Sequence, residues 1–419
     1  MNDIIKKIKS GVALSYEELD NIFSGYLNNK VSDDDMTVIL KLICKYGLSD
    51  KEVFDLVDIF INSGDVFDVN YDFIDKHSTG GVGDKTTLIV LPILASLGVN
   101  ISKMSGRALG YTGGTIDKLN SIGVKTDLSK DEFYKCIDDI GMVISSQTDN
   151  LCPMDKKVYA LRDVTGTTKS IPLIATSIMS KKIASGAGKI LLDVKVGKGA
   201  LVNNLSDARK LANLMIRIGK KYKREVVCII SDMNNPLGDN VGNKIEILEV
   251  VDILKNGKRN DLSHLCTIMA SIMLEMSKGI YYETAKEMVL DSLNKGLAYD
   301  KFCLFVKHQG GNLDIKLPKC KKIVSQKSGY VKSINSMMIG NYSNLLGAGR
   351  VKKDDEIDYN AGIILKTGIN SYVRKGDVLA EIYGNTEKVT DISDAFRISK
   401  FKSKKSEIII EIIRLYVCK

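Results

Sequence analysis

The sequence contains no tryptophan, and only five prolines and 6% aromatic residues occur in its 419 positions. Its histidines are His77, His264 and His308, which are too few for a histidine-based metal site. No run of about 18 apolar residues occurs, so we expect no membrane-spanning helix and no membrane partner. The first residues lack the apolar stretch and small-residue cleavage site of a secretory signal, which predicts a cytoplasmic protein.

Cysteine motifs and basic blocks are also missing. No C-x-x-C pair occurs among the eight cysteines, so we expect reduced, buried thiols. Lys+Arg total 60 and Asp+Glu total 51, which gives a net charge of +9 without a dominant basic block. This charge suits an anionic small substrate as well as a nucleic acid. Because no stretch interleaves basic and aromatic residues, we expect no nucleic-acid partner.

The pattern of apolar residues divides the chain into three successive regions. Residues 1–64 show helical spacing of apolar residues, with capping boxes at 15–18 and 49–52. Between Asn70 and Asn256, short β-branched runs alternate with amphipathic segments, and strands are predicted at 189–196 and 225–231 with a helix between them. From Leu317, short β runs lie between glycine and aspartate turns. The sequence thus predicts a small helical domain, a larger α/β domain with a mixed, mainly parallel sheet, and a small C-terminal β-rich domain.

A glycine-rich loop at residues 75–87 is typical of a phosphate-binding site. It follows a short apolar run and precedes an apolar helical pattern. A glycine-rich turn at a helix N-terminus exposes backbone N–H groups, and the helix dipole favours an anion there. Lys76 adds a positive charge, and Ser78 and Thr87 add hydroxyl donors.

This loop has two other interpretations. A nucleoside-triphosphate loop needs a glycine where Asp84 stands, and a carboxylate there would repel the triphosphate, so we exclude it. An ordinary strand-to-helix turn is the alternative that this loop alone leaves open.

A second glycine-rich loop lies at residues 103–119. Its cations and hydroxyls are Lys103, Ser105, Arg107 and Thr115. If each loop follows a strand of one sheet, the two converge at the carboxyl edge of that sheet, where open α/β sheets bind ligands. An ion pair between Arg107 and Asp117 is the alternative structural role for that arginine.

A third candidate group is Arg162, Ser177 and Lys181. Ser177 and Lys181 are four residues apart and share a helix face, so with Arg162 they could donate to the carbonyl oxygens of a pyrimidine. A solvated basic helix face is the alternative. His77 lies beside Lys76 in the first loop, where proton transfer is the functional interpretation and a packed side chain the alternative.

These segments resemble those of the pyrimidine-nucleoside phosphorylases and thymidine phosphorylases. The likeness is carried by K-H-S-T-G-G-V-G-D at 76–84 and by S-G-R-A-L-G-Y-T-G-G-T-I-D-K-L at 105–119. Further similar segments lie at 159–165, 170–174, 177–182, 192–195, 236–238, 346–350 and 357–362. The resemblance covers nearly the whole chain.

The resemblance implies a homodimeric enzyme with three domains. Residues 1–66 would form a helical domain, joined in space by 158–185. Residues 70–157 and 186–310 would form an α/β phosphate-binding domain, and 320–400 a C-terminal β-rich domain. The implied reaction is reversible phosphorolysis of pyrimidine nucleosides (uridine, thymidine, deoxyuridine) to free base and (2-deoxy)ribose 1-phosphate. Inorganic phosphate is the co-substrate, and no organic cofactor is expected.

The same resemblance implies the site residues by position. Phosphate would be held by Lys76, Ser78, Thr87, Lys103, Ser105 and Thr115. The base would be held by Arg162, Ser177 and Lys181, and His77 would hydrogen-bond the base near O2 and assist its departure. The expected catalytic residues are therefore His77, Arg162 and Lys181. A potassium ion would be bound, mostly through backbone carbonyls, by Gly83, Lys85, Leu237, Asn240 and Glu249.

Four positions depart from the family pattern. Lys85 stands where a small hydroxyl residue is expected, so either its carbonyl still coordinates the cation or its ammonium replaces the ion. Asn120 replaces a glutamate, Tyr111 replaces a histidine or similar residue, and Ala108 replaces a glycine. Lys103 favours the broad pyrimidine-nucleoside branch over the strict thymidine phosphorylases.

Two enzymatic alternatives accompany this interpretation. The first is a strict thymidine phosphorylase. The lesser alternative is an enzyme like anthranilate phosphoribosyltransferase, which resembles this family in fold and binds magnesium-pyrophosphate. Its characteristic acidic magnesium ligands are not evident in this sequence, and it usually lacks a C-terminal β domain.

Overall fold

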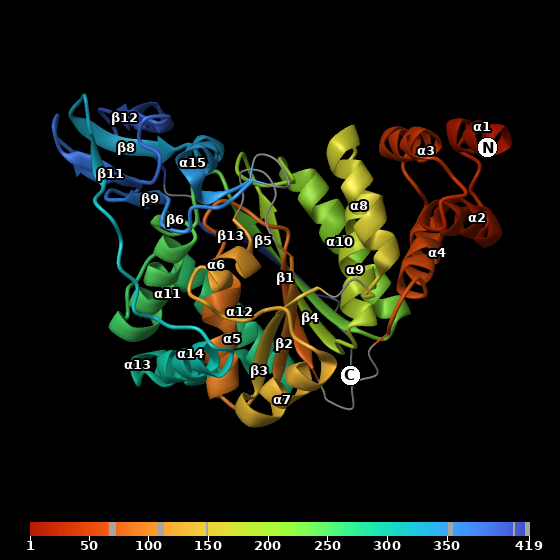
Figure 1. Ribbon diagram of the computed structural model, residues 1–419, viewed down its shortest axis with the longest axis horizontal. Helices are drawn as coiled ribbons and strands as arrows, with labels where there is room; N and C mark the ends of the chain where they lie inside the picture. Colours follow the sequence, from red (N-terminus) through yellow and green to blue (C-terminus); the bar gives the residue numbers. More distant parts are fainter. Residues whose placement is uncertain (67–72, 107–112, 148–149, 351–354, 405–406, 415–419) are drawn as a thin grey trace.

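The computed structural model describes residues 1–66, 73–106, 113–147, 150–350, 355–404 and 407–414. Figure 1 shows N-terminal helices on one side, a central α/β part, and a C-terminal β-rich part on the other side. This arrangement confirms the predicted fold class. Within the described ranges, no helix has both the length and the apolar character needed to cross a membrane.

The N-terminal part consists of four helices: α1 (Asn2–Ser10), α2 (Tyr16–Leu27), α3 (Asp33–Tyr46) and α4 (Asp50–Ile61). Both predicted capping boxes are present, because Ser15 and Ser49 each accept a bond from the N–H of the glutamate three residues later. Helix α8 (Pro153–Thr165), far along the chain, contributes Met154, Val158 and Leu161 to the apolar core of these helices.

The central sheet has the order β13-β5-β4-β1-β2-β3. Its strands are β1 (Ile74–Ser78), β2 (Ile101–Ser105), β3 (Met142–Ser146), β4 (Lys189–Val196), β5 (Glu225–Asp232) and β13 (Ile409–Arg414). Only β13 among these pairs is antiparallel to its neighbour. Strand β1 lies between β2 and β4, so the direction in which strands are added reverses beside it. Open α/β sheets bind their ligands at such a switch point.

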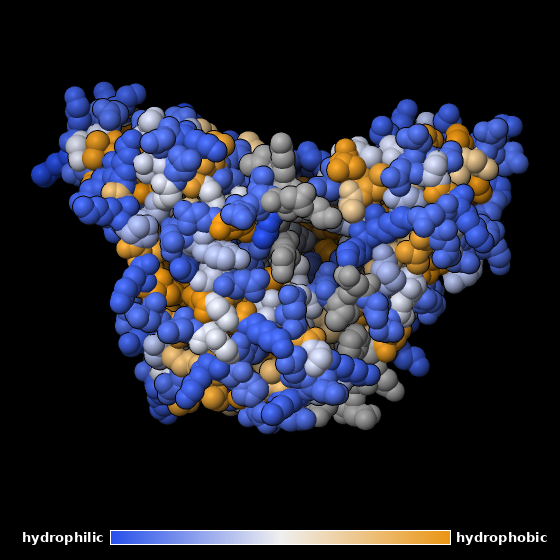
Figure 2. Space-filling model, in the orientation of Figure 1, coloured by the Kyte–Doolittle hydropathy of each residue, from blue (hydrophilic) through white to orange (hydrophobic). Residues whose placement is uncertain are grey.

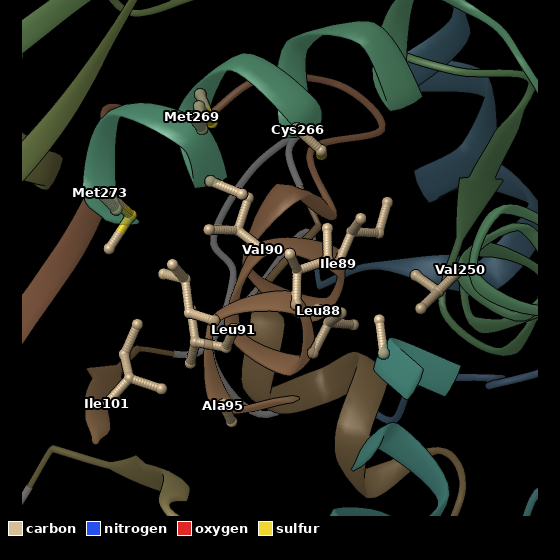
Figure 3. Close-up of a cluster of buried hydrophobic side chains, with 14 of the residues drawn as sticks. Leu88, Ile89, Val90, Leu91, Ala95, Ile101, Val250, Cys266, Met269 and Met273 are labelled. Carbon is tan, nitrogen blue, oxygen red and sulfur yellow. The ribbon is translucent and has the colours of Figure 1, made fainter. Parts of the chain in front are cut away.

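Helix α5 (Thr86–Ser96) follows β1 and is enclosed by apolar side chains. Every residue from Thr86 to Ala95 is buried, as expected for a helix that is apolar on all sides. Figure 3 shows Met269 and Met273 of α12 (Asp261–Lys278) and Val250 of α11 (Lys244–Asn256) packed around it. This packing fixes the helix N-terminus, and with it the end of the first glycine-rich loop.

The other helices of the central part are α6 (Thr115–Asn120), α7 (Lys130–Ile140), α9 (Ile171–Ala184), α10 (Leu205–Lys221), α13 (Tyr282–Asn294) and α14 (Leu297–His308). Helix α9 packs against both α4 and α10, so it lies between the N-terminal helices and the central sheet (Figure 1).

The C-terminal part contains two small sheets, with orders β10-β8-β12 and β6-β9-β11-β7. Their strands are β6 (Asn240–Gly242), β7 (Lys321–Val324), β8 (Gly329–Ile334), β9 (Gly362–Leu365), β10 (Tyr372–Val373), β11 (Val378–Tyr383) and β12 (Phe396–Ser399), with α15 (Ser336–Ser343) beside them. Because β6 comes from the central part and pairs with β9, it ties the two parts together. The C-terminal part has its own apolar core, and Val82 of the first glycine-rich loop belongs to it.

The described cysteines are free thiols. Cys136, Cys152, Cys228 and Cys266 are buried, as the sequence predicts. The prediction of a buried thiol is wrong for Cys44, which is exposed on α3, and Cys303 and Cys320 are only half-buried.

Candidate active site

A cavity of about 750 Å³ lies between the loops that follow β1 and β2 and the helices α8 and α9. Its volume is within the range of small-molecule sites. Figure 2 shows the molecule hollowed between the C-terminal part and the N-terminal helices. Each glycine-rich loop leads from a strand into a helix, since α5 follows the first loop and α6 follows the second.

The predicted phosphate-binding residues lie mostly on one side of this cavity. Those that line it are Ser78, Thr87, Lys103, Ser105 and Thr115. Ser78 ends β1 and Ser105 ends β2, and the two strands are parallel neighbours in which Ile74 pairs with Ile101. The two serines therefore occupy equivalent positions at the carboxyl edge of the sheet, as the sequence predicts for converging loops.

Lys76 differs from that prediction because it does not line the cavity. It is buried, and its ammonium donates to the Thr86 hydroxyl, which in turn donates to Asp84 Oδ1 at 2.6 Å. Burial opposes ionisation of Asp84, but the charges of Lys195 and Lys76 hold its pKa well below the usual value. Lys76 therefore acts on the site through its charge and through Thr86.

The predicted base-binding group lines the opposite side, where α8 supplies Arg162 and α9 supplies Ser177 and Lys181. The alternative of a solvated basic helix face is wrong. Helix α9 is buried on nearly all sides, and Ser177 and the neighbouring Lys182 are both buried.

Asp155 of α8 determines the position of the Lys181 ammonium. Lys181 donates to the Asp155 carboxylate and, at 3.1 Å, to Ser177 Oγ. Asp155 is itself buried and lines the cavity. Sequence reasoning missed this residue, although Asp155 and Arg162 are seven residues apart and so share one face of a helix.

Arg162 is held by backbone carbonyls. Its Nε donates to Thr167 at 3.3 Å, Nη1 to Leu173 at 3.1 Å and Nη2 to Thr168 at 3.0 Å. A guanidinium has five N–H donors, so these three bonds leave two for a ligand. The side chain is therefore fixed in orientation while donors remain at the cavity wall.

His77 lines the cavity and is influenced by the ammonium groups of several lysines. Burial lowers its pKa well below the usual value, and the nearby charges of Lys103, Lys182, Lys181 and Lys76 lower it further. The imidazole is therefore neutral at pH 7. In that form it offers one N–H donor and one acceptor nitrogen.

The charge of Lys103 is destabilised in the same way. Burial and the ammonium of Lys182 lower the pKa of Lys103 well below its usual range, against the opposing effect of Asp75. Lys182 donates to Asp75 Oδ2 at 2.5 Å, and Lys103 lies 3.9 Å from Asp75 Oδ1. Two lysines thus share one carboxylate, and an anion in the cavity would relieve their repulsion. Sequence reasoning missed both Lys182 and Asp75 as part of the site.

The five residues expected to hold potassium lie close together but behind the cavity lining. The Lys85 ammonium donates to the Leu237 carbonyl at 3.1 Å and to Glu249 Oε2 at 2.8 Å. Gly83 has φ +77°, and a Cβ on it would lie 2.5 Å from the Leu237 oxygen, so this position requires glycine. Glu249 Oε2 also accepts the Asn240 N–H at 3.0 Å. The Leu237 carbonyl and the Glu249 carboxylate thus already have partners within the protein.

Two of the positions that depart from the family pattern, Ala108 and Tyr111, lie outside the described residues, as does Arg107 of the second loop. Asn120 accepts a hydrogen bond from Thr126 Oγ1 at 3.1 Å. Asp117, the suggested partner of Arg107, forms an ion pair with Arg350 at 3.0 Å.

Comparisons with known proteins place this geometry in context. Residues 70–299 match a family model described as the glycosyl transferase family, a/b domain, and residues 2–64 match its helical bundle domain. Residues 330–399 match the pyrimidine nucleoside phosphorylase C-terminal domain.

Curated relatives match over almost their whole length. The chain is 43% identical over 405 residues to a pyrimidine-nucleoside phosphorylase of Staphylococcus epidermidis, covering 94% of each chain. It is 42% identical over 405 residues to one of Geobacillus stearothermophilus, with the same coverage. Among solved structures, anthranilate phosphoribosyltransferase of Thermus thermophilus matches with a TM-score of 0.57 and 16% identity, over 73% of this chain and 98% of that chain. At that identity the likeness shows the fold alone.

Proposed function

Since the chain belongs to the pyrimidine-nucleoside phosphorylase family and is a pentosyltransferase, we propose that it catalyses the reversible phosphorolysis of uridine, deoxyuridine and thymidine. The products are the free base and (2-deoxy)ribose 1-phosphate. The observation that carries this proposal is a single cavity whose two walls have different chemistry. One wall has hydroxyls and Lys103 at the ends of β1 and β2, and the other has Arg162, Ser177 and Lys181 on α8 and α9.

Inorganic phosphate is the co-substrate, and it binds at the first wall. Ser78, Ser105 and Thr115 donate hydroxyl hydrogen bonds, as does Thr87, and Lys103 supplies charge. Lys76 contributes its charge from behind the wall. Burial lowers the pKa values of His77 and Lys103, and neighbouring ammonium charges lower them further. Those ammonium charges support this assignment, because an anion would neutralise them.

The base binds at the second wall. Cleavage of the glycosidic bond leaves positive charge on the sugar and negative charge on the base. Arg162 and Lys181 stabilise the negative charge on the base oxygens, as preorganised donors do in an oxyanion hole. Phosphate, on the opposite face of C1′, stabilises the sugar cation and then bonds to that carbon, which inverts it.

His77 hydrogen-bonds the departing base near O2. Because its pKa is lowered, it acts as a neutral N–H donor and not as an imidazolium acid. The two walls belong to different parts of the molecule, so closure of α8 and α9 towards the sheet precedes chemistry. The domain boundaries at residues 66, 158, 185, 310 and 320, a homodimer, and a cytoplasmic location are parts of the same proposal.

The substrate range is tested by measuring kcat/KM for uridine, deoxyuridine, thymidine and cytidine at saturating phosphate. Turnover of the first three is expected, since the base-binding wall addresses base oxygens that all three share and Lys103 favours the broad pyrimidine-nucleoside branch. Turnover of thymidine and deoxyuridine without uridine would instead establish the alternative, a strict thymidine phosphorylase.

A further inference from the structure

The ammonium of Lys85 lies where the family resemblance implies a potassium ion. It donates to the Leu237 carbonyl oxygen at 3.1 Å and to Glu249 Oε2 at 2.8 Å, and its side chain has no exposed surface. Both acceptors belong to the expected cation ligands. Since an ammonium already contacts these oxygens, the residues present do not fit a separate metal ion at the same position.

We infer that Lys85 supplies, as a covalently attached ammonium, the positive charge that a bound monovalent cation would otherwise supply. The protein then needs no potassium for stability or for activity. A free ion stabilises a protein only to the extent that its concentration exceeds its dissociation constant. An attached ammonium removes that dependence.

The charges around Lys85 are balanced without an added ion. Lys118 lies 3.3 Å from Glu246 Oε2, and Lys85 lies 4.0 Å from the same oxygen. Lys258 contacts Asp239 at 2.7 Å and Glu249 Oε1 at 3.2 Å. The cluster therefore pairs the ammonium groups of Lys85, Lys118 and Lys258 with the carboxylates of Asp239, Glu246 and Glu249. A further cation would leave an uncompensated charge in a buried site, which is costly.

Glu249 is bonded from several sides in this cluster, and the Lys85 ammonium lies 2.8 Å from its Oε2. Its oxygens also accept the Asp239 N–H at 2.9 Å and the Asn260 amide at 2.9 Å. Lys85 is the fully buried cation beside this carboxylate, and the partly exposed Lys258 pairs with its other oxygen.

The cluster also positions the first glycine-rich loop. Lys85 is the N-cap of α5, and Lys118 donates to the Asp84 carbonyl at 3.1 Å. Asp84 and Thr87, which lie just before and just after Lys85 in the sequence, line the cavity. Lys85 is therefore a positioning residue for the phosphate-binding wall, a consequence that rests on the proposed function.

The wild-type protein provides the first test, which needs no activity. After exhaustive dialysis, Tm is measured in potassium, sodium and tetramethylammonium chloride at equal ionic strength. The inference expects the same Tm in all three salts. A saturable rise in Tm that is specific to potassium would overturn it. Tm is measured without substrate. A potassium-dependent Tm would therefore overturn the inference even if the protein is a phosphorylase, and a protein without phosphorylase activity could still have a Tm that does not depend on potassium.

The second test is Lys85→Ala, which leaves the carbonyl and carboxylate oxygens without their ammonium. Loss of one member of a buried ion pair should lower Tm by roughly 10 °C and raise the KM for phosphate. Potassium should recover at least half of the lost Tm, and tetramethylammonium should not, because it is too large for the space.

The matched control is Lys195→Ala. Lys195 is as fully buried as Lys85, but its acceptors in the structure are the Asp193 carboxylate at 2.7 Å and the Ser231 hydroxyl. Its variant should lose stability without potassium-specific recovery. A Lys85→Ala protein with wild-type Tm in every salt, or one that potassium does not rescue, would contradict the inference. If Lys85→Ala fails to fold, the wild-type comparison decides.

Discussion

Lys182 of α9 donates to Asp75 Oδ2 of β1 at 2.5 Å, which joins the base-binding side of the molecule to the central sheet through a buried ion pair. Asp75 also faces Lys103 at 3.9 Å. One carboxylate thus compensates two ammonium groups, of which one lies in the proposed phosphate-binding wall. If phosphate binds at this wall as proposed, we expect its binding to depend on pH and on the charge of Asp75.

Asp75→Asn should shift the loss of phosphate binding to a lower pH, and the two proteins should differ most between the Lys103 pKa of the variant and that of the wild type. Asp75 raises the pKa of Lys103, whereas burial and Lys182 lower it. Removing the carboxylate charge lowers that pKa further, so Lys103 loses its proton at a lower pH and the KM for phosphate rises there. The measurement is KM for phosphate from pH 6.5 to 9.5 in wild type and variant. Coincident profiles for the two proteins would show that Lys103 does not carry the phosphate charge.

His77→Ala should reduce kcat by a factor of about 10² to 10³, the usual result of removing one preorganised hydrogen-bond donor, and leave the KM for phosphate nearly unchanged. Its lowered pKa means that the wild-type imidazole stays neutral as the pH falls below 6.5. The acid limb that His77 contributes to kcat/KM should therefore lie well below the usual histidine range. His77→Gln, which keeps an N–H donor, should retain more activity than the alanine variant. An unchanged kcat in His77→Ala would remove this residue from the reaction.

Lys181→Ala should impair every pyrimidine nucleoside in both reaction directions, because the ammonium addresses the base and not the sugar. Asp155→Asn should cause a smaller loss in kcat, since it removes the charge that orients Lys181 but leaves the ammonium in place. Kinetics with uridine and thymidine, forwards and from base plus sugar 1-phosphate, separate the two effects. Full activity of Lys181→Ala on any one pyrimidine nucleoside would exclude it from base binding.

Leu88→Ala should destabilise the protein by about 2–5 kcal/mol, the usual result of emptying a tightly packed position. Leu88 is fully buried on α5, a helix that is enclosed on all sides. Denaturant or thermal unfolding monitors the change. As a surface control, Leu304→Ala on α14, where the leucine is 44% exposed, should change stability little.

Local signals predicted much of this fold because they depend on neighbouring residues. The capping boxes at Ser15 and Ser49, the strands β4 and β5, and the helix after the first glycine-rich loop agree with the sequence patterns. The convergence of Ser78 and Ser105 also followed, since it requires only that the two strands be parallel neighbours.

Features that depend on distant parts of the chain could not be predicted in the same way. Lys76 carries the expected charge, but its direction is set by Thr86 and not by its place in the motif. The partners of Lys85, Leu237 and Glu249, lie more than a hundred positions away, so the sequence left two roles for Lys85 open. Asp155 could not be identified from the sequence, because its partner Lys181 lies 26 positions away and contacts it only in the folded protein.

In the proposed reaction, phosphate is a reactant in cleavage of the glycosidic bond. The decisive experiment follows uridine and thymidine with and without inorganic phosphate, and identifies the free base and the sugar product together. We expect base release only with phosphate, in equal amount to a sugar 1-phosphate of inverted configuration at C1′. Base release at the same rate without phosphate, or a reaction that requires magnesium and pyrophosphate, would contradict it.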